Sequence, residues 1–358
     1  MADVSGQRKP WIFVSSLVCV VGASLLWFVA PSPHWGVFGL LCVVIANIGL
    51  EFGVLFNNAM LPDIVPKERI GRLLGWAWGL GYAGGLAALA IALTVFIWPE
   101  HPPFALDTDA AEHVRIVGSM VALWLAVFSV PLFLFAPDRP AAAESLVSAV
   151  RIGLKNTRRI LIGLRRNRSV AFFLLAHMIY TDGLLTLFAF GGVYAAGAFG
   201  LSLDEVVIFG IALNVAAGLG AFGFAWIDDW IGSKPTIILA LVGLILASII
   251  AVTATELTWL WVGGIGIGIF VGPAQSASRS LMAKLSPTEE QGAYFGLFSL
   301  SGKATAFLGP AIVALVTSAS GSQRIGLAAI IPFFVIGLLA LLAVKEPRRG
   351  GLRKTSGA

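Results

Sequence analysis

Charged side chains are scarce in this chain of 358 residues, since Asp, Glu, Lys and Arg make up only 12% of it while 58% is hydrophobic. Soluble globular domains carry about 25% charged residues, so a chain with half that share has too little polar surface to face water. The charges are also bunched, because runs of about 20 uncharged residues alternate with short polar connectors. We therefore expect lipid to be the solvent for most of this chain.

Features that usually carry enzyme or metal chemistry are also missing. The two cysteines, Cys19 and Cys42, lie inside apolar runs without a CxxC pair or metal-ligand spacing. The four histidines form no HExxH motif, and no P-loop or nucleophile–base pair is visible. Gly79-x-Gly81-x-x-Gly84 matches a dinucleotide fingerprint, but no strand precedes it, and close helix packing explains these small residues better. We expect no enzyme, no cofactor and no metal.

Ten apolar stretches are long enough to cross a bilayer, which takes about 20 helical residues at 1.5 Å each. Helices are expected because backbone groups cannot go unpaired in lipid. The sequence therefore predicts an all-α multi-pass membrane protein with about ten transmembrane helices. The stretches cover residues 11–30, 36–61, 73–98, 116–136, 170–196, 205–227, 236–254, 257–275, 293–317 and 326–344.

The positive charges favour one side of the membrane. With a cytoplasmic N-terminus, 21 of the 24 Lys and Arg residues fall in cytoplasmic segments, Arg115 and Arg324 fall outside, and Lys303 lies within a span. The positive-inside rule then supports both the helix count and cytoplasmic termini. The basic composition thus indicates topology, and we expect no nucleic-acid partner. The expected location is the inner membrane of a bacterium or an endomembrane such as the vacuole of a eukaryote, with a monomer as the default state.

The longest internal connector, 137–169, predicts a division of the chain into two bundles. Residues 1–136 form the first bundle, 170–344 form a six-helix second bundle, and 345–358 form a cytoplasmic tail. Apolar residues recur in the connector at roughly helical spacing beside a basic stretch. That pattern fits an amphipathic helix on an anionic leaflet, and it fits a solvated linker equally well.

Two short patterns occur twice, which indicates an internal duplication. The connector Asp3-x-x-Gly6-x-Arg8 matches Asp229-x-x-Gly232-x-Lys234, at an offset of 226 residues. The pattern P-x-E-x-x-G-x-x-x-G begins at residue 66 and again at residue 287, at an offset of 221. Both copies of each pattern fall on the cytoplasmic side with six helices between them. The repeats are therefore parallel, as in the two halves of major-facilitator transporters, and an inverted repeat is excluded.

Three further stretches carry a closer family resemblance: 57–64 (NNAMLPDI), 75–82 (GWAWGLGY) and 295–303 (FGLFSLSGK). The chain resembles the vacuole-effluxer or "unknown major facilitator" family related to autophagy-related protein 22, over essentially its whole length. The resemblance implies a major-facilitator fold with four helices of the N-terminal bundle, family helices 3–6, followed by helices 7–12. Family helices 1 and 2 would precede the first connector, so we expect them to be missing through a misplaced start, a truncation or gene decay.

Charges inside the membrane are functional candidates, because each costs roughly 2.5–3.5 kcal/mol at the centre of a span. This chain has three: Glu51, Asp182 and Lys303. The resemblance places them on family helices 4, 7 and 11, near the central cavity. Asp182 can load and release a proton, and Lys303 can meet an anionic group such as a carboxylate. The alternative is that either carboxylate pairs with Lys303 or caps backbone groups.

Polar residues near these charges complete the candidate pathway. His177 and Tyr180, three residues apart, share one helix face, whereas Asp182 points elsewhere. Asn57 and Asn58 lie near the end of a span, where hydrogen bonding between helices is the simpler role. Under the resemblance, a set of connector residues forms gating loops whose charges bridge helix ends in one state and separate in the other. The gating set is Asp3, Gly6, Arg8, Asp229, Gly232 and Lys234.

The predicted function is secondary active transport of a small organic solute by alternating access. The resemblance implies efflux, with an amino acid as the best candidate and with protons as a candidate coupling ion. The alternatives are a non-transporting membrane scaffold or sensor, a truncated inactive paralogue, or an integral-membrane enzyme. An enzyme should show a cluster of catalytic polar residues at one interface, and no such cluster is evident in the sequence.

Overall fold

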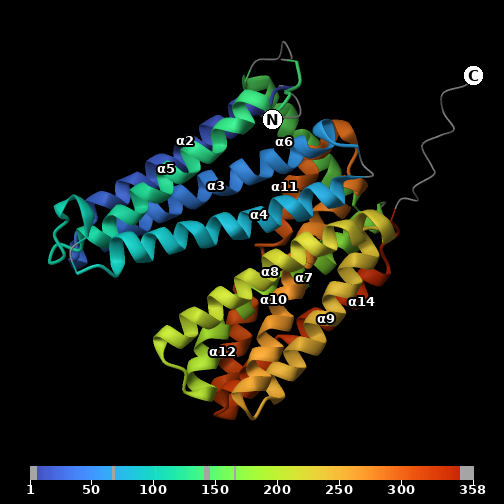
Figure 1. Ribbon diagram of the computed structural model, residues 1–358. Helices are drawn as coiled ribbons and strands as arrows, with labels where there is room; N and C mark the ends of the chain where they lie inside the picture. Colours follow the sequence, from blue (N-terminus) through green and yellow to red (C-terminus); the bar gives the residue numbers. More distant parts are fainter. Residues whose placement is uncertain (1–5, 67–68, 101, 141–145, 165–166, 347–358) are drawn as a thin grey trace, which may run out of the picture. The chain divides into compact units, whose positions relative to one another are not determined.

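The computed structural model describes residues 6–66, 69–100, 102–140, 146–164 and 167–346, and the regular elements in these ranges are helices (Figure 1). Nine of the described helical segments are long and apolar enough to cross a membrane. The predicted stretch 293–317 instead forms two shorter helices, α11 (Gln291–Ser301) and α12 (Leu308–Ser320). The expected all-α membrane fold is confirmed, with the ninth predicted span interrupted.

Backbone contacts divide the chain into two compact units, and the first comprises Met1–Ile64 and Gly84–Asn156. In this unit α2 packs against both α3 and α5. The last part of α4 also belongs here and continues into a π-helical turn over Ala92–Ile97. The helix bounds are α2 Lys9–Leu25, α3 Gly36–Ile64, α4 Ile70–Ile91 and α5 Glu112–Phe135.

The second unit comprises Val65–Ala83 and Thr157–Ala358, so it includes the first part of α4. Its core is formed where α10 packs against α8 and α9, and where α7 packs against α14. Leu241, Leu244, Phe295 and Phe334 are fully buried there. The helices of this unit are α7 Arg168–Phe199, α8 Leu203–Ile231, α9 Ser233–Thr253, α10 Leu257–Leu285, α11, α12, α13 Gln323–Ala328 and α14 Ile331–Leu342.

Local sequence signals set several helix ends in the second unit. The Asn167 side chain accepts the N–H of Val170 and so begins α7, while Gly200 ends that helix in a left-handed conformation at φ 70°. A capping box between Ser202 and Glu205 then begins α8. These caps hold α7 and α8 in fixed registers, and the registers decide which side chains face the interior.

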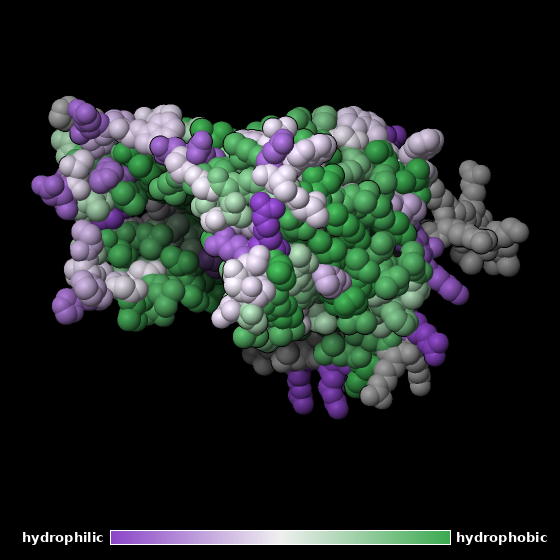
Figure 2. Space-filling model, turned by 90° about the horizontal axis from the view of Figure 1, so that it is seen from below, coloured by the Kyte–Doolittle hydropathy of each residue, from purple (hydrophilic) through white to green (hydrophobic). Residues whose placement is uncertain are grey.

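Large apolar side chains cover the outer faces of the helices. Leu123, Leu134 and Leu219 are each 65–68% exposed. Figure 2 shows such apolar surfaces in green over broad areas of the face in view, with hydrophilic residues in purple gathered in smaller groups. A soluble protein rarely exposes large contiguous apolar faces, whereas hydrocarbon tails accept them. The chain is an integral membrane protein.

The connector, the unit boundary, the end of α10 and the tail can each be compared with the sequence prediction. Within the connector 137–169, α6 (Leu146–Gly163) is helical, as the spacing predicted. The division by contacts places 65–83 with the second unit, so the predicted bundle boundaries remain a prediction. Helix α10 continues to Leu285, which puts Arg279 inside a spanning helix and not after it. Most of the predicted tail, from residue 347 onward, lies outside the described residues.

Candidate functional site

At the starts of four helices, a carboxylate from another part of the chain lies beside backbone N–H groups that have no partner within the helix. Each carboxylate accepts one or two of these N–H groups, and its negative charge also complements the helix dipole. The four pairs are Asp138 with α2, Asp229 with α4, Glu346 with α9, and Asp182 with α12. The first three lie at connectors, and the fourth lies within the apolar part of the second unit.

In the first unit, the connector just before α2 contacts the end of α3 and the segment at the end of α5. Asp138 accepts the N–H groups of Arg8 and Lys9, both at 3.0 Å, and the Lys9 ammonium donates to the carbonyl of Phe133 at 2.9 Å. The Arg8 side chain is only 1% exposed and forms an ion pair with Asp63 near the end of α3. Predicted gating residue Arg8 is therefore anchored to two helices.

The second unit repeats this arrangement around α9. Glu346 accepts the N–H groups of Ser233 and Lys234 at 2.9 and 3.0 Å, and the Lys234 ammonium donates to the carbonyls of Leu342 and Val344. Gly6 and Gly232 both adopt the left-handed region, at φ 78° and 104°. These matching contacts, made separately in each unit, support the internal duplication.

The register of the repeat needs one correction. The sequence patterns aligned Arg8 with Lys234. By their contacts, Lys9 and Lys234 are equivalent, because both follow a carboxylate-capped N–H and both donate to a carbonyl near the end of the unit's last long helix. Ser233 therefore occupies the place of Arg8. This explains why the second copy has no arginine beside Lys234.

Charge polarity is inverted between the two connectors. In the first unit the cation, Arg8, belongs to the connector and the anion, Asp63, belongs to α3. In the second unit the anion, Asp228, lies at the connector and the cation, Lys284, lies at the end of α10, with 3.1 Å between Nζ and Oδ1. Asp63 and Lys284 are 221 residues apart, the same offset as the second repeated pattern. Sequence reasoning missed this pair, although that offset was available to find it.

Ser233 joins the connector to α10 in the second unit. Its hydroxyl lies 2.5 Å from Asp228 Oδ1, 2.8 Å from the Ser280 hydroxyl and 2.6 Å from Lys284 Nζ. Glu346 adds a second carboxylate 3.8 Å from Lys284. The side chains of Asp228 and Lys284 are only 3% and 15% exposed, so this network is largely out of contact with water.

The first part of α4 packs closely on the end of α8. Asp229 accepts the Arg72 N–H at 3.1 Å and pairs with the Arg72 guanidinium at 3.3 Å. A side chain at Gly71 would meet the carboxyl group of Asp228 at 2.5 Å, and one at Gly75 would meet Ala225 at 2.5 Å. The glycines of the first P-x-E-x-x-G-x-x-x-G pattern therefore permit this contact.

Of the predicted gating set, Asp3 lies outside the described residues.

A second polar cluster lies where α7, α10 and α11 meet. The Tyr180 hydroxyl lies 2.6 Å from the Ser278 hydroxyl, and His177 Nδ1 lies 2.9 Å from the Ser301 hydroxyl. Each serine donates its only hydrogen to a backbone carbonyl of its own helix, so Tyr180 and His177 are the donors in these pairs. His177 and Tyr180 share a face, as their spacing predicted, with ring centroids 5.5 Å apart.

Arg279 lies beside this cluster, six residues before the end of α10. Its guanidinium carbon is 4.3 Å from the centre of the Trp78 ring and 6.0 Å from that of Phe298, and one N–H donates to the Gln275 carbonyl at 3.0 Å. Stacking on a ring stabilises a cation where water is scarce. Sequence reasoning counted Arg279 among the cytoplasmic residues, because hydropathy ends the apolar stretch at residue 275.

The remaining candidates are spread over the chain. Glu51 is half-buried near the middle of α3, while Asn57 is exposed and Asn58 buried near the end of that helix. Lys303 is exposed and lies in the turns between α11 and α12. Asp182 is 1% exposed and faces α12, on a different side of α7 from His177. Its place apart from His177 agrees with the spacing.

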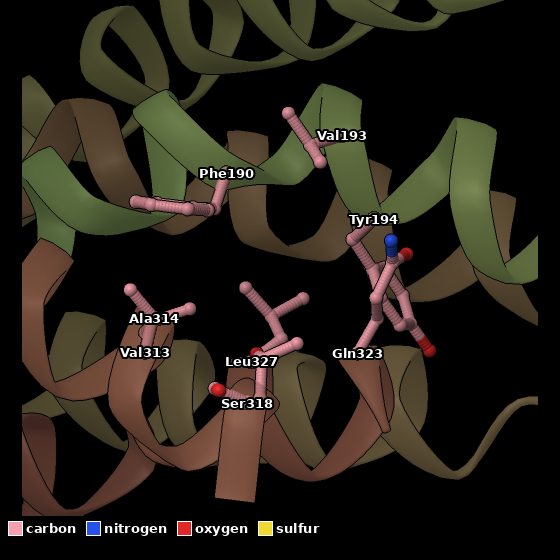
Figure 3. A pocket seen from close by; sticks show the side chains of 9 residues that line it. Phe190, Val193, Tyr194, Val313, Ala314, Ser318, Gln323 and Leu327 are labelled. Carbon is pink, nitrogen blue, oxygen red and sulfur yellow. The ribbon is translucent and has the colours of Figure 1, made fainter. Parts of the chain in front are cut away.

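A pocket of about 250 Å³ lies in the second unit between the late part of α7 and the helices α12 and α13 (Figure 3). Its lining is mostly apolar, with Tyr194 and Gln323 beside each other at one end. The Tyr194 hydroxyl is already bonded to the carbonyl of Ala251 at 3.0 Å. None of the predicted site residues lines this pocket, and its walls suit an apolar group better than a charged solute.

Metal binding has no support within the described ranges. There, no three His, Cys, Asp or Glu side chains come close enough together to hold a metal ion. What the described arrangement offers is a set of charged helix-end contacts and a cation stacked on aromatic rings. Contacts of the first kind can hold or release helices, and the second kind recognises anions.

Comparison with known proteins agrees with these features. Residues 67–351 match the model of the family described as "Vacuole effluxer Atg22 like". The MFS-type transporter YxiO of Bacillus subtilis is 23% identical over 346 residues, which cover 97% of this chain and 79% of that protein. Autophagy-related protein 22-1 of Neosartorya fischeri is 23% identical over 308 residues, and the chain spans about half of its length, 49%.

A solved structure shows the same fold. The fucose:proton symporter FucP of E. coli superposes with a TM-score of 0.72 over 95% of this chain and 84% of that one, at 14% identity. The family match covers most of the chain, and the fold agrees with it. The chain therefore belongs to the Atg22-like vacuole effluxer family of major-facilitator transporters.

Proposed function

We propose that this chain is a secondary active carrier that exports a small organic solute bearing a carboxylate, with an amino acid as the best candidate. Its family is one of transporters, and the family description supports efflux as the direction. The pairs at the helix ends suit alternating access, because ion pairs of this kind can hold helices together in one state and separate in another. FucP, which shares the fold, is described as a proton symporter, and this supports a proton gradient as the energy source.

The observation that carries the substrate class is the position of Arg279. It lies about 9 Å from the end of α10, inside the helix. A charged side chain is energetically costly there, and such residues are therefore functional candidates. Its planar guanidinium rests on Trp78, and an arginine held in this way presents N–H groups in the geometry that a carboxylate accepts. Amino acids carry such a carboxylate. Lys303 is a second candidate cation for the same group.

Charge distribution supports the proposed orientation. With both termini in the cytoplasm, the connectors that hold Arg8, Arg72, Lys234 and Lys284 lie on the cytoplasmic side. The carrier would then lie in the inner membrane of a bacterium or in an endomembrane such as the vacuole of a eukaryote. Small solutes, lipid and protons are the proposed partners.

Transport in proteoliposomes tests the proposal. Uptake of a mixture of labelled amino acids should rise when a pH gradient is imposed and should be abolished by ionophores that dissipate it. Arg279→Gln should lower the apparent affinity at least tenfold, and Arg279→Lys should recover only part of it, because a lysine lacks the planar fork.

Arg324 offers a matched control. Its guanidinium also stacks on an aromatic ring, Phe199 at 5.1 Å, and also donates to a backbone carbonyl, that of Ala254. Arg324→Gln should therefore reproduce any structural cost of losing such a cation without changing affinity. Flux that is absent from both wild type and variants would favour the alternative of a non-transporting scaffold, a sensor or an inactive paralogue.

A further inference from the structure

The ninth predicted span, residues 293–317, is broken inside the second unit. Helix α11 ends at Ser301, and α12 begins at Leu308 after six residues in turns. Pro310 is one cause, because it has no N–H to offer the carbonyl of Ala306 one turn earlier and its ring crowds that carbonyl. Interrupted helices in carriers place helix termini inside the membrane, where they can act on charged groups.

Asp182 lies directly against the start of α12. Its Oδ1 atom accepts the N–H of Gly309, the second residue of that helix, at 3.1 Å. Gly309 is required for this approach, since a side chain there would lie 2.0 Å from the Thr186 hydroxyl and 2.9 Å from Asp182 Oδ1. Thr186 in turn donates to the backbone carbonyl of Asp182 at 2.7 Å. The start of α12 therefore contacts the carboxyl group of Asp182 on α7.

The other oxygen of this carboxyl group, Oδ2, is buried, and no side chain among the described residues lies within 3.5 Å of it in hydrogen-bonding geometry. The Thr305 side chain, in the turns before α12, is the polar group that faces the carboxyl group there. The whole residue is 1% exposed and sits near the middle of the 32-residue helix α7. No ion pair among the described residues includes Asp182. A lone carboxylate buried in this way is far more costly than a neutral carboxyl group.

Few titratable groups lie on the helices around Asp182. Helices α12 and α14 carry none, and α11 carries only Tyr294. The cation of α13, Arg324, is directed to the Ala254 carbonyl. Of the two cations of α10, Arg279 is directed to Gln275 and Trp78, and Lys284, at the helix end, to Asp228 and Ser233. Within α7, His177 and Tyr180 are bonded to Ser301 and Ser278 on another side, and the acidic residues of α8 lie at its two ends. Lys303 is exposed in the turns before α12.

We propose that Asp182 carries the coupling proton of this transporter on Oδ2, and that the start of α12 holds the carboxylate once the proton has left. The inference rests on the proposed function for its role in transport, although protonation itself does not depend on a substrate. The step is a simple proton transfer: the O–H bond of the carboxyl group breaks, and the proton passes to water. No oxidation or reduction takes place.

Both the charged and the neutral form of the Asp182 carboxyl group are stabilised by neighbouring groups. The Gly309 N–H bonds Oδ1 in either form, and the positive end of the α12 dipole lowers the cost of the charged form. In the neutral form, the Thr305 side chain in the turns before α12 is the neighbouring polar group that can share a hydrogen bond with the carboxyl group. A group with support in both states can exchange its proton as access to water alternates.

Infrared spectroscopy of the purified protein in lipid nanodiscs tests the protonation directly. The C=O stretch of a protonated carboxyl group should be present in wild type near neutral pH, shift in D₂O and vanish in Asp182→Asn. Asp204→Asn is the matched control, because Asp204 is exposed at the start of α8 and its loss should leave the band unchanged. A band that persists in Asp182→Asn overturns the proposal.

A second measurement keeps the proposal testable if the variant fails to fold. Dicyclohexylcarbodiimide reacts with protonated carboxyl groups in apolar surroundings, so wild type should be labelled at Asp182, and less so as the pH rises. The label is located by peptide mass. Absence of labelling at every pH would contradict the assignment. Sodium is the competing ligand: stabilisation of wild type by Na⁺ without any protonated band would mark a sodium site and refute the proton.

Transport then tests the role of the proton. One proton coupled to each solute permits about tenfold accumulation for each unit of pH difference. Asp182→Asn should lose this accumulation and keep exchange of labelled for unlabelled solute, which needs no net proton movement. Gradient-driven accumulation that survives in the variant refutes a coupling role. Absence of flux in wild type would count against the proposed function and leave the infrared result to decide the protonation.

Discussion

Lys284 is the side chain whose loss should destabilise the second unit most clearly. Lys284→Met leaves Asp228, with 3% of its side chain exposed, without its cation. Removing one partner of a buried ion pair costs about 3–5 kcal/mol, and the Ser233 hydroxyl that remains beside Asp228 favours the lower end. We therefore expect a loss of about 3 kcal/mol, which corresponds to a fall of about 6–12 °C in Tm.

Asp228→Asn should be milder than Lys284→Met. Lys284 would still have Glu346 at 3.8 Å and the Ser233 hydroxyl at 2.6 Å, so its charge stays partly compensated. The double variant Asp228→Asn/Lys284→Met removes both charges and should cost less than the sum of the single changes by about 2 kcal/mol. Thermal unfolding in one detergent gives all four stabilities.

The pair Arg159 and Glu290 is the control for this cycle. The Arg159 side chain is 67% exposed, so Arg159→Gln should cost only about 0–1 kcal/mol. If the costs at Asp228 and Lys284 simply add, or if Lys284→Met is no worse than Arg159→Gln, the network does not act as a buried ion pair. That outcome would refute the reasoning.

Two further predictions concern close packing at glycines. Gly71→Ala should lower stability by about 1–3 kcal/mol, because the new methyl group would lie 2.5 Å from the carboxyl carbon of Asp228. Gly81→Ala on the same helix meets nothing within 4 Å, and a Tm as low as that of Gly71→Ala would contradict this account. Gly309→Ala should be destabilising by a similar amount, because its methyl group would lie 2.0 Å from the Thr186 hydroxyl. Adding Thr186→Ala should recover part of the Tm, and no recovery would place the clash elsewhere.

The candidate site was only partly visible in the sequence. The D-x-x-G pattern located the connectors, and the P-x-E-x-x-G-x-x-x-G pattern located the glycines that α4 uses against α8. Asp63, Asp138 and Glu346 gave no signal of their own, because a single carboxylate near a helix end is common. Only their distance to an N–H or a guanidinium marks them as partners.

Arg279 shows a second limit. Hydropathy ends the apolar stretch at residue 275, since Ser, Arg and Lys follow, yet α10 runs on to Leu285. A helix continues through polar residues when neighbouring helices can satisfy them, here through Trp78 and Tyr180. Composition along one segment does not contain that information.

The sequence by itself determined that this chain is a helical membrane protein, because the period and length of its apolar runs leave backbone groups no other way to be paired in lipid. It also determined the duplication, since the nearly equal offsets of two repeated patterns, 226 and 221 residues, can be read without knowledge of contacts. Tertiary structure alone decided which side chains the connector charges contact, and that Asp182 is buried against the start of α12. The reason is that the energy of a charge depends on which groups surround it, and those groups lie 55, 56 and 127 residues away in sequence.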